Sequence, residues 1–367
     1  MKKTFLIIDI GTTTIASKMI DAAGIQPPRQ FSMRNSQRKY GADVITRARA
    51  AMMGKAAQLQ QLMLDDIARC IAEYGTAPTD LMIAGNPVMM CLLHGVDVSP
   101  LVNNPFDAQH VNYPLESEIL GYPARSLPYL SAFFGGDALA SLCCAQTLQT
   151  AAKAPFLMID FGTNCEIAFY DGSEMICSSA AAGPVFEGGH ISCGTAAMPG
   201  AVDRVTLQAG DLRFTTISAA PPIGICGSGL VDLIAALVKL NIIDTSGKMA
   251  LDYYFAPGLS LTPKDVREFQ VGKAAVCAAI ETLCKNTRPQ TVYLCGKMGE
   301  NLSVENAVAI GMLPAWIQTC SVMPITDSVL QGALLYDAQK EILQSCRAVS
   351  LDGNADFDDL FIDCMGF

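Results

Sequence analysis

The sequence predicts an α/β fold of two related domains, and three observations carry this prediction. The chain has 367 residues, of which 51% are apolar and 16% are charged, so it can bury more than one core. An eight-residue segment near the N-terminus recurs near the middle of the chain. Patterns typical of buried strands and of amphipathic helices alternate in both halves. We therefore expect a first domain over residues 1–150 and a second over residues 151–327.

The repeated segment opens each domain. Phe5–Thr12 reads FLIIDIGT and Phe156–Thr163 reads FLMIDFGT, with six of eight positions identical. An extended stretch follows each copy, over Thr14–Asp21 in the first and over Glu166–Tyr170 in the second, where Asp171-Gly172 marks a hairpin turn. Each domain is therefore predicted to begin with a buried strand, a tight Asp-x-Gly-Thr turn and a returning strand.

Both tight turns have the residues that phosphate binding needs. Glycine lets the backbone approach an anion closely and point successive amides at it, and threonine hydroxyls add donors. The aspartate that ends each strand, Asp9 or Asp160, can bind magnesium through water or orient an attacking group. The alternative is a pair of ordinary hairpin turns. The candidate phosphate-binding residues are Gly11, Thr12, Thr13 and Thr14 in the first turn and Gly162, Thr163 and Asn164 in the second.

The remaining pattern fits two α/β lobes. We expect helices over Ala57–Tyr74, Ala138–Thr150, Leu230–Leu240, Val271–Cys284 and Gly332–Leu343, and buried strands over Leu81–Asn86 and Thr291–Leu294. Residues 98–131 are rich in proline and predict an irregular insertion or lid on the first domain. The late helix, within residues 328–345, is expected to pack back on the first domain, and residues 346–367 form a C-terminal tail.

Two glycine-rich loops are candidates for binding the nucleoside. The first follows a predicted buried strand, where glycines let a flat ligand reach the backbone, although glycine as simple loop punctuation is the alternative. The second opens a helix and could contact ribose or phosphate, or Ser228 could simply cap that helix. The candidates are Gly296, Lys297 and Gly299 in the first loop and Gly227, Ser228 and Gly229 in the second.

Two glutamates are candidates for orienting a water molecule on the γ-phosphate. Glu166 lies just beyond the second turn, and Glu187 lies in the glycine-rich segment 183–189. A solvated loop carboxylate is the alternative for each. Together with Asp9 and Asp160 they form the candidate catalytic set, in which the two aspartates are also the candidate metal ligands.

Charge and cysteine usage narrow the range of partners. A formal net charge of −10 argues against binding to nucleic acid. No stretch is long and apolar enough to span a bilayer, and Asp9 interrupts the apolar N-terminus, so we expect a cytoplasmic protein with no membrane partner. The fourteen cysteines contain no C-x-x-C spacing, which favours reduced, mostly buried thiols over disulfides, zinc or iron–sulfur ligation.

Several of these segments resemble a known superfamily. Asp9–Thr14, Asp160–Asn164 and the loop at Gly296 are similar to the two phosphate motifs and the adenosine motif of the acetate kinase/sugar kinase/Hsp70/actin superfamily. That resemblance implies two ribonuclease-H-like (actin-like ATPase) domains flanking a nucleotide cleft. A closer likeness is to the C-terminal ATPase region of the reductive activators of corrinoid proteins. It rests on Tyr40–Arg47 (YGADVITR), Gly85–Met89, Gly135–Asp137, Ala181–Gly188, Ile225–Leu230 and Ile310–Pro314.

The resemblance implies that the chain binds ATP with Mg²⁺, and that ATP hydrolysis accompanies reduction of an inactive cob(II) corrinoid protein to cob(I). In that family a plant-type [2Fe–2S] domain precedes the ATPase region. This chain starts at the first phosphate turn and lacks the C-x₄-C-x₂-C spacing of such a cluster. We therefore expect no iron–sulfur cluster in this chain. Either a separate ferredoxin-like protein supplies the electron, or the chain is a paralogue with another partner. Lys297 stands where the family commonly has glycine, and its cation could alter adenine packing or contact a phosphate.

Two other functions are compatible with the same fold. A small-molecule kinase of the superfamily would use the same turns, but the sequence offers no sugar- or acid-binding constellation. A non-hydrolysing, ATP-gated binding protein would bind nucleotide without turnover. The sequence names neither the corrinoid nor any other partner, and it leaves both a monomer and a homodimer open.

Overall fold

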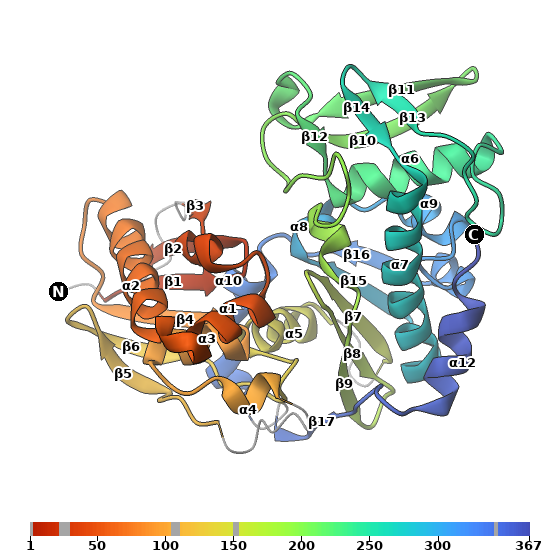
Figure 1. Ribbon diagram of the computed structural model, residues 1–367. Helices are drawn as coiled ribbons and strands as arrows, with labels where there is room; N and C mark the ends of the chain where they lie inside the picture. Colours follow the sequence, from red (N-terminus) through yellow and green to blue (C-terminus); the bar gives the residue numbers. More distant parts are fainter. Residues whose placement is uncertain (1–2, 22–29, 104–110, 150–153, 341–343) are drawn as a thin grey trace. The chain divides into compact units, whose positions relative to one another are not determined.

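The chain folds into two compact units, shown in the computed structural model of Figure 1. Unit 1 consists of Met1–Thr150 and Asp327–Ala348, and unit 2 consists of Ala151–Thr326 and Val349–Phe367. Each unit is described by itself. The structure describes residues 3–21, 30–103, 111–149, 154–340 and 344–367.

A mixed sheet forms the centre of unit 1, in the strand order β3-β2-β1-β4-β6-β5. Strand β1 is antiparallel to β2 and parallel to β4, so the buried first strand lies in the middle of the sheet. Its side chains alternate between two faces. Leu6 and Ile8 belong to the larger apolar cluster of the unit, whereas Ile7 belongs to a smaller cluster that includes Leu330. The strands are β1 (Thr4–Ile10), β2 (Thr14–Asp21), β3 (Gln30–Arg34), β4 (Asp80–Gly85), β5 (Glu116–Ile119) and β6 (Tyr122–Ser126).

Helices cover this sheet. The predicted helix over residues 57–74 is confirmed as α2, and its apolar positions Leu59, Met63 and Ile67 are buried. The late segment packs on α5, where the Ser141 and Ser328 hydroxyls lie 2.8 Å apart. The helices are η1 (Ser36–Tyr40), α1 (Val44–Ala50), η2 (Ala51–Lys55), α2 (Ala56–Glu73), α3 (Pro87–His94), α4 (Ser99–Val102), α5 (Gly136–Leu148), α10 (Ser328–Gly332) and η7 (Ala333–Gln339), and a short strand β17 (Cys346–Ala348) follows.

The late segment differs from the predicted continuous α-helix over residues 332–343. The α-helical turn begins earlier, at Ser328, and the chain continues from Ala333 as a 3-10 helix. Close packing explains the local sequence, because a Cβ atom at Gly332 would collide with the carbonyl oxygen of Ala140 in α5. Residues 341–343 of the predicted helix lie outside the described residues.

The prediction of an irregular insertion over residues 98–131 is wrong for its second half. Strand β6 pairs in parallel with β4, and β5 pairs with β6 at the edge of the central sheet. Pro123 does not prevent this, because it lies near the start of β6, before the pairing with β4 begins at Ala124. Residues 104–110 of the expected insertion lie outside the described residues.

Unit 2 is built on a second mixed sheet that contains the strand order β16-β15-β7-β8-β9. Strand β7 is antiparallel to β8 and parallel to β15, as β1 is to β2 and β4 in unit 1. The structural repeat predicted from the sequence is therefore confirmed. These strands are β7 (Phe156–Phe161), β8 (Cys165–Tyr170), β9 (Met175–Ala180), β15 (Thr291–Cys295) and β16 (Ser321–Pro324).

The rest of unit 2 contains the two predicted helices, α6 and α7, together with elements that the sequence did not reveal. Helix α7 begins eight residues before the predicted start at Val271, because Thr262 and Asp265 form a capping box and Pro263 occupies the first turn. The additional strands are β10 (Ala201–Gln208), β11 (Asp211–Thr216), β12 (Gly224–Ile225), β13 (Tyr253–Ala256) and β14 (Leu259–Leu261). The helices are η4 (Pro184–Glu187), η5 (Ile217–Ala219), α6 (Gly227–Lys239), α7 (Pro263–Leu283), α8 (Gly296–Asn301), α9 (Val304–Ala309), η6 (Ala315–Thr319) and α12 (Ala355–Asp363).

The C-terminal segment is part of the core of unit 2 rather than a loose tail. The Phe367 ring stacks on Phe269 of α7, with ring centroids 6.4 Å apart. The fully buried Lys273 of α7 donates from Nζ to the carbonyl oxygens of Cys364 (2.6 Å) and Gly366. Burial lowers the pKa of Lys273 to about 8. The last residues therefore supply the carbonyl oxygens that bind the buried Lys273 ammonium group, and Phe367 adds a ring to the aromatic cluster at Phe269.

The expectation of free, mostly buried thiols is confirmed. All fourteen cysteines are free, ten of them buried and four half-buried. In the part of the chain that the structure describes, no helix is both long and apolar enough to cross a bilayer.

Candidate functional site

The first candidate phosphate loop, residues 11–14, joins β1 to β2 and is called loop 1 below. Ile10 pairs with Ile15 at the end of the hairpin, so four residues make the turn. A Cβ atom at Gly11 would lie 2.6 Å from the carbonyl oxygen of Thr14, which explains why this position is glycine. Asp9 is half-buried and pairs with Ala16 across the hairpin. Its carboxylate therefore has an apolar cross-strand neighbour.

Two residues that sequence reasoning did not assign to the site bind the carbonyl groups of this loop. Asn35 donates from Nδ2 to the Gly11 oxygen (2.9 Å) and from its backbone N–H to the Thr13 oxygen (3.0 Å). Arg47 donates from Nη2 to the Thr12 oxygen (2.6 Å). Three consecutive carbonyls of loop 1 are thus hydrogen-bonded to groups outside the loop.

The starts of two helices lie beside the same loop. Asn86 caps α3 by accepting from the Met89 amide (3.0 Å), and its Nδ2 donates to Thr12 Oγ1 (3.3 Å). Helix α5 starts close by, since a Cβ atom at Gly135 would lie 2.7 Å from Asn86 Cα and 2.9 Å from the Gly85 oxygen. The Gly85–Met89 and Gly135–Asp137 motifs therefore serve the surroundings of loop 1.

The second candidate phosphate loop, residues 162–164, joins β7 to β8 in unit 2 and is called loop 2 below. Phe161 pairs with Cys165, so this turn has three residues. The Gly162 amide donates to the Asn164 oxygen at 3.0 Å, which closes the turn on itself. Loop 2 is therefore one residue shorter than loop 1.

Two candidate carboxylates come together beside loop 2. Asp160 and Glu166 are directly opposite in the β7–β8 pair, and residues opposite in such a pair project from the same face with Cβ atoms about 5 Å apart. Ser179 of β9 donates to Glu166 Oε1 at 3.4 Å. Burial raises the pKa of the Cys165 thiol well above its usual value, and the neighbouring carboxylates of Glu166 and Asp160 raise it further. The thiol at this position therefore stays protonated.

The fourth candidate carboxylate contacts loop 2 from a different element. Glu187 ends the 3-10 helix η4 and accepts a hydrogen bond at Oε2 from the hydroxyl of Thr163. Gly188, the next residue, adopts a φ of 81° and lies against Thr195, so the chain turns sharply behind Glu187. The structure thus brings Glu187 to loop 2, and the glycines of its segment make the turn possible.

The candidate adenosine loop lies at the carboxyl end of β15, next to Asp160. Gly296 has a φ of 76°, and a Cβ atom there would lie 2.5 Å from the Phe161 oxygen and 2.9 Å from Asp160 Oδ1. Lys297 Nζ lies 3.2 Å from the Glu300 carboxylate, one turn along α8. The close approach of Gly296 to β7 therefore joins this loop to loop 2.

The other glycine-rich turn packs against neighbouring backbone. Cβ atoms at Gly227 and Gly229 would collide with the carbonyl oxygens of Phe186 and Val202. Ser228 does not cap α6, whose N-cap residue is Cys226, and instead donates to the Asp203 oxygen at 3.1 Å. The glycines thus bring α6 close to η4 and β10, and the interpretation of Ser228 as a helix cap is wrong.

Two family models match the chain, one over each half. The model described as the RACo middle region matches residues 6–150, and the model described as the C-terminal domain of RACo, the ASKHA domain, matches residues 154–367. The second match alone covers more than half of the chain. The chain belongs to the RACo family.

Individual relatives agree with this assignment to the RACo family. The chain is 28% identical over 395 aligned positions to the corrinoid activation enzyme RamQ of Eubacterium limosum, covering 94% of this chain and 66% of that protein. It is 24% identical to the [Co(II) methylated amine-specific corrinoid protein] reductase of Methanosarcina barkeri, covering 74% of this chain and 58% of the reductase. A solved structure of a reductive activator for corrinoid, iron–sulfur protein superposes with a TM-score of 0.85 at 26% identity, covering 100% of this chain and 66% of that one. The chain thus spans less than two thirds of the length of the curated relatives it matches.

The predicted α/β fold of the acetate and sugar kinase/Hsp70/actin class is confirmed by the RACo-family match and by this superposition. The site residues Asn35 and Arg47 were missed because each reaches loop 1 across a long sequence separation. Arg47 closes the YGADVITR segment that contributed to the family resemblance, so that segment was the available signal.

The residues of this RACo-family chain fit a magnesium ion bound together with nucleotide phosphates. Among the described residues, no three His, Cys, Asp or Glu side chains converge to hold a metal ion by themselves. Mg²⁺ with ATP usually takes only one or two carboxylates, with water and phosphate oxygens completing its octahedron. Asp9 in unit 1 and Asp160 in unit 2 are the carboxylates that would hold such an ion, and Glu166 lies opposite Asp160. When bound, the ion would neutralise charge on the phosphates.

Proposed function

We propose that this protein is a magnesium-dependent ATPase that couples ATP binding and hydrolysis to the reductive activation of a corrinoid protein. The observation that carries the proposal is the RACo-family match over both halves of the chain, with an Asp-x-Gly-Thr hairpin at the start of each half. The corrinoid enzymes among its relatives support the substrate class.

In this proposal the two loops bind the phosphates of ATP. Amides and hydroxyls of Gly11 to Thr14 and of Gly162 to Asn164 donate to phosphate oxygens. The loop at Gly296 binds the adenosine, with its glycines allowing a flat ligand close to the backbone. Gly227, Ser228 and Gly229 act mainly through packing, because their contacts are with backbone of β10 and η4. The contacts of these two glycine-rich segments are consistent with adenosine binding at Gly296 and with packing at residues 227–229.

Four carboxylates have proposed roles in hydrolysis. Asp9 and Asp160 orient magnesium-bound waters. Glu187 is the better placed of the two glutamates to orient the attacking water, because it contacts the hydroxyl of Thr163 in loop 2. Glu166 lies opposite Asp160 and supplies a second negative charge beside the proposed ion and its waters. Hydrolysis gives ADP and inorganic phosphate.

Reductive activation also needs an electron from outside the nucleotide site. One electron passes from a low-potential donor to the cob(II) centre of the partner and yields cob(I). We propose a ferredoxin-like iron–sulfur protein as that donor, and a cytoplasmic location for the reaction. If the protein has two conformational states, ATP would shift the equilibrium toward the state that binds it more tightly. The size of that shift is set by the difference in affinity.

The test measures Mg²⁺-dependent phosphate release from ATP by the purified protein, with and without corrinoid methyl-transfer proteins held in the cob(II) state. We expect release to rise when the correct corrinoid protein is added, and cob(I) to appear in its absorption spectrum only when ATP and a reduced ferredoxin are both present. Phosphate transfer to a metabolite in a mixed pool, without corrinoid stimulation, would identify a small-molecule kinase instead. Nucleotide binding with neither activity would identify an ATP-gated binding protein.

A further inference from the structure

Arg47 is a fully buried arginine whose donors are directed at backbone and sulfur. Its Nη2 donates to the Thr12 oxygen (2.6 Å), its Nε donates to the Gly41 oxygen (3.0 Å), and its Nη1 lies 3.5 Å from Met89 Sδ. A planar guanidinium reaches several acceptors at fixed angles, which the single ammonium group of a lysine cannot do. Arg47 therefore fixes loop 1 relative to the start of α1 and to α3.

Asn35 is the second residue that binds loop 1, and it is also buried. Its Nδ2 and its backbone N–H bind the Gly11 and Thr13 oxygens, while its Oδ1 accepts from the Gln37 amide at 2.9 Å and caps η1. The Nδ2, Oδ1 and backbone N–H groups of Asn35 are thus all hydrogen-bonded, which fixes the orientation of its side chain. Loop 1 contacts Arg47 at its middle carbonyl and Asn35 at the two flanking ones.

The planarity of the peptide bond gives these contacts a consequence for the amides. In a trans peptide the C=O group of one residue and the N–H group of the next point in opposite directions. A carbonyl fixed at Gly11, Thr12 or Thr13 therefore fixes the direction of the amide that follows it. Each of these amides points away from the side chain or amide that binds its carbonyl. Phosphate loops bind anions through such oriented successive amides.

We propose that Arg47 and Asn35 are positioning residues for the triphosphate, which hold the carbonyls of loop 1 so that the amides of Thr12, Thr13 and Thr14 are preset for an anion. The inference rests on the proposed ATP-binding function. The guanidinium adds a permanent positive charge one peptide unit behind those amides, which further favours a negatively charged ligand.

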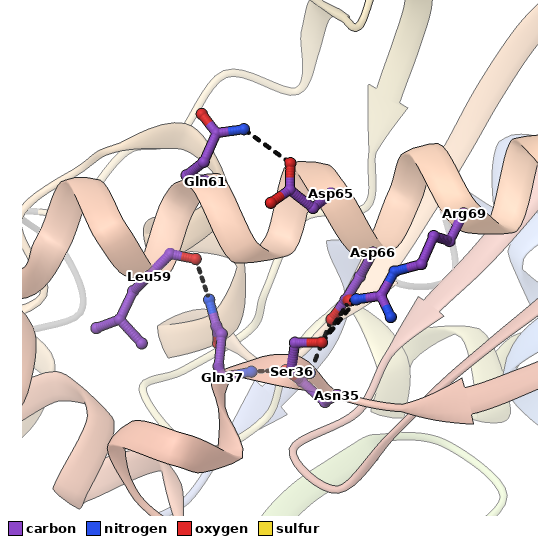
Figure 2. A network of polar contacts seen from close by, with 8 residues as sticks. All are labelled: Asn35, Ser36, Gln37, Leu59, Gln61, Asp65, Asp66 and Arg69. Carbon is purple, nitrogen blue, oxygen red and sulfur yellow. Dashed lines mark hydrogen bonds and ion pairs between the residues drawn. The ribbon is translucent and has the colours of Figure 1, made fainter.

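A polar network on helix α2 keeps Asn35 in place, as Figure 2 shows. The buried carboxylate of Asp66 accepts from the backbone N–H (2.8 Å) and the hydroxyl (2.8 Å) of Ser36, the residue after Asn35. Arg69 contacts the same carboxylate and donates to the Ser36 hydroxyl at 2.7 Å. Gln37 donates from Nε2 to the Leu59 oxygen of α2 at 2.8 Å. The segment that carries Asn35 is therefore attached to α2 at two successive residues.

The test compares Arg47→Lys and Asn35→Asp with the unchanged protein by hydrogen–deuterium exchange, with and without ATP and Mg²⁺, together with the Kd for ATP. Arg47→Lys keeps the positive charge but loses the planar guanidinium, which binds several acceptors at once. Asn35→Asp keeps the acceptor that caps η1 and loses the donor to Gly11. The control is Arg125→Lys, at the Arg125–Asp337 ion pair elsewhere in unit 1, where Arg125 is half-buried. Thermal unfolding of every variant is recorded alongside.

We expect ATP to slow exchange in peptides that cover residues 11–14 and residues 162–164 of the unchanged protein. In both variants the protection at residues 11–14 is lost and that at 162–164 remains, while the Kd for ATP rises about tenfold, since one or two net hydrogen bonds are lost. The control keeps both protections and its affinity.

Three results overturn the inference or its basis, and they differ from one another. ATP protection retained at residues 11–14 in both variants overturns the positioning role, while the ATP-binding proposal stands. Exchange that rises throughout unit 1, with a lowered Tm and no selective change at loop 1, shows that the two residues only stabilise the fold. No ATP protection at either loop of the unchanged protein contradicts the proposed function itself.

Discussion

Loop 1 and loop 2 begin from nearly the same sequence and end in different surroundings. Both follow a central strand, and both have glycine next to the strand that carries the aspartate. Loop 1 has four residues, and its carbonyls are bound by Asn35 and Arg47. Loop 2 has three, and the groups around it are carboxylates, with Glu166 opposite Asp160 and Glu187 on the hydroxyl of Thr163.

Under the proposed function, this difference predicts a division of labour between the two copies. Buried donors behind a loop preset its amides for an anion, which is a binding function. Carboxylates next to a loop suit a hydrated magnesium ion and an attacking water, which are functions in hydrolysis. At the position of Glu166 the hairpin of unit 1 has Ala16, so the duplicated hairpin carries its second acidic residue in unit 2 alone. We therefore expect substitutions at loop 2 to lower turnover more than affinity, and substitutions at loop 1 to do the reverse.

The largest difference is expected between the two aspartates. Asp160→Asn should lower ATP turnover about 100-fold, because it removes a charge next to the proposed metal. Asp9→Asn should lower turnover about tenfold, and the double variant should lose Mg²⁺-dependent ATP binding. Phosphate release across a magnesium titration measures both effects. Asp252→Asn, at an exposed aspartate in unit 2, is the control and should match the unchanged protein. Equal losses at Asp9 and Asp160 would contradict the division of labour.

A second test concerns the close approach of the adenosine loop to loop 2. Gly296→Ala combines a positive φ of 76° with a Cβ atom 2.5 Å from the Phe161 oxygen. Gly210→Ala shares the positive φ, at 91°, but has nothing within 4 Å of its added Cβ. We expect Gly296→Ala to lower the free energy of unfolding by about 2 kcal/mol more than Gly210→Ala does. Urea unfolding followed by circular dichroism gives both values. Equal losses would mean that the loop relaxes away from β7.

The third comparison removes the extra carboxylate from loop 2. Glu166→Ala gives unit 2 the residue type that unit 1 has opposite its aspartate. Turnover should fall about tenfold while the Kd for ATP changes less than about twofold, since the proposed role of the carboxylate is in hydrolysis rather than in binding. Glu166→Gln, which keeps the shape and the contact with Ser179, separates charge from packing. A loss in affinity as large as the loss in turnover would place Glu166 among the binding residues.

The sequence predicted the parts of the fold that depend on local pattern. The repeat placed β1 and β7 with their turns, and helical spacing placed α2. It did not predict that residues 116–126 join the central sheet, because a proline-rich segment shows no alternation and its pairing partner β4 is distant in the chain. Helix α12 was also missed, although its sequence carries signals: Asn354 caps it, and Phe357 and Phe361, one turn apart, pack on the core of unit 2.

The candidate site divides along the same line. Asp9, Asp160 and the glycines of both loops followed from the repeated motif. Glu187 was a candidate from composition, but only the structure shows its contact with Thr163. Arg47 and Asn35 bind loop 1 through hydrogen bonds that span 22 to 35 positions in the chain, and no local pattern encodes such a contact.

The smallest expected effects concern one hydroxyl in each loop. Thr163 donates to Glu187, whereas Thr12 Oγ1 accepts from Asn86, so the same residue type faces a proposed catalytic group in one loop and a helix cap in the other. Thr163→Val should lower kcat about fivefold with KM nearly unchanged, because Glu187 loses one hydrogen bond that orients it. Thr12→Val should raise KM about fivefold with kcat nearly unchanged, because its hydroxyl serves binding. Steady-state phosphate release gives both constants, with Thr→Ser at each position as the control that restores the hydroxyl. If both valine variants changed the same constant, the two loops would share one role, and their different surroundings would reflect packing alone.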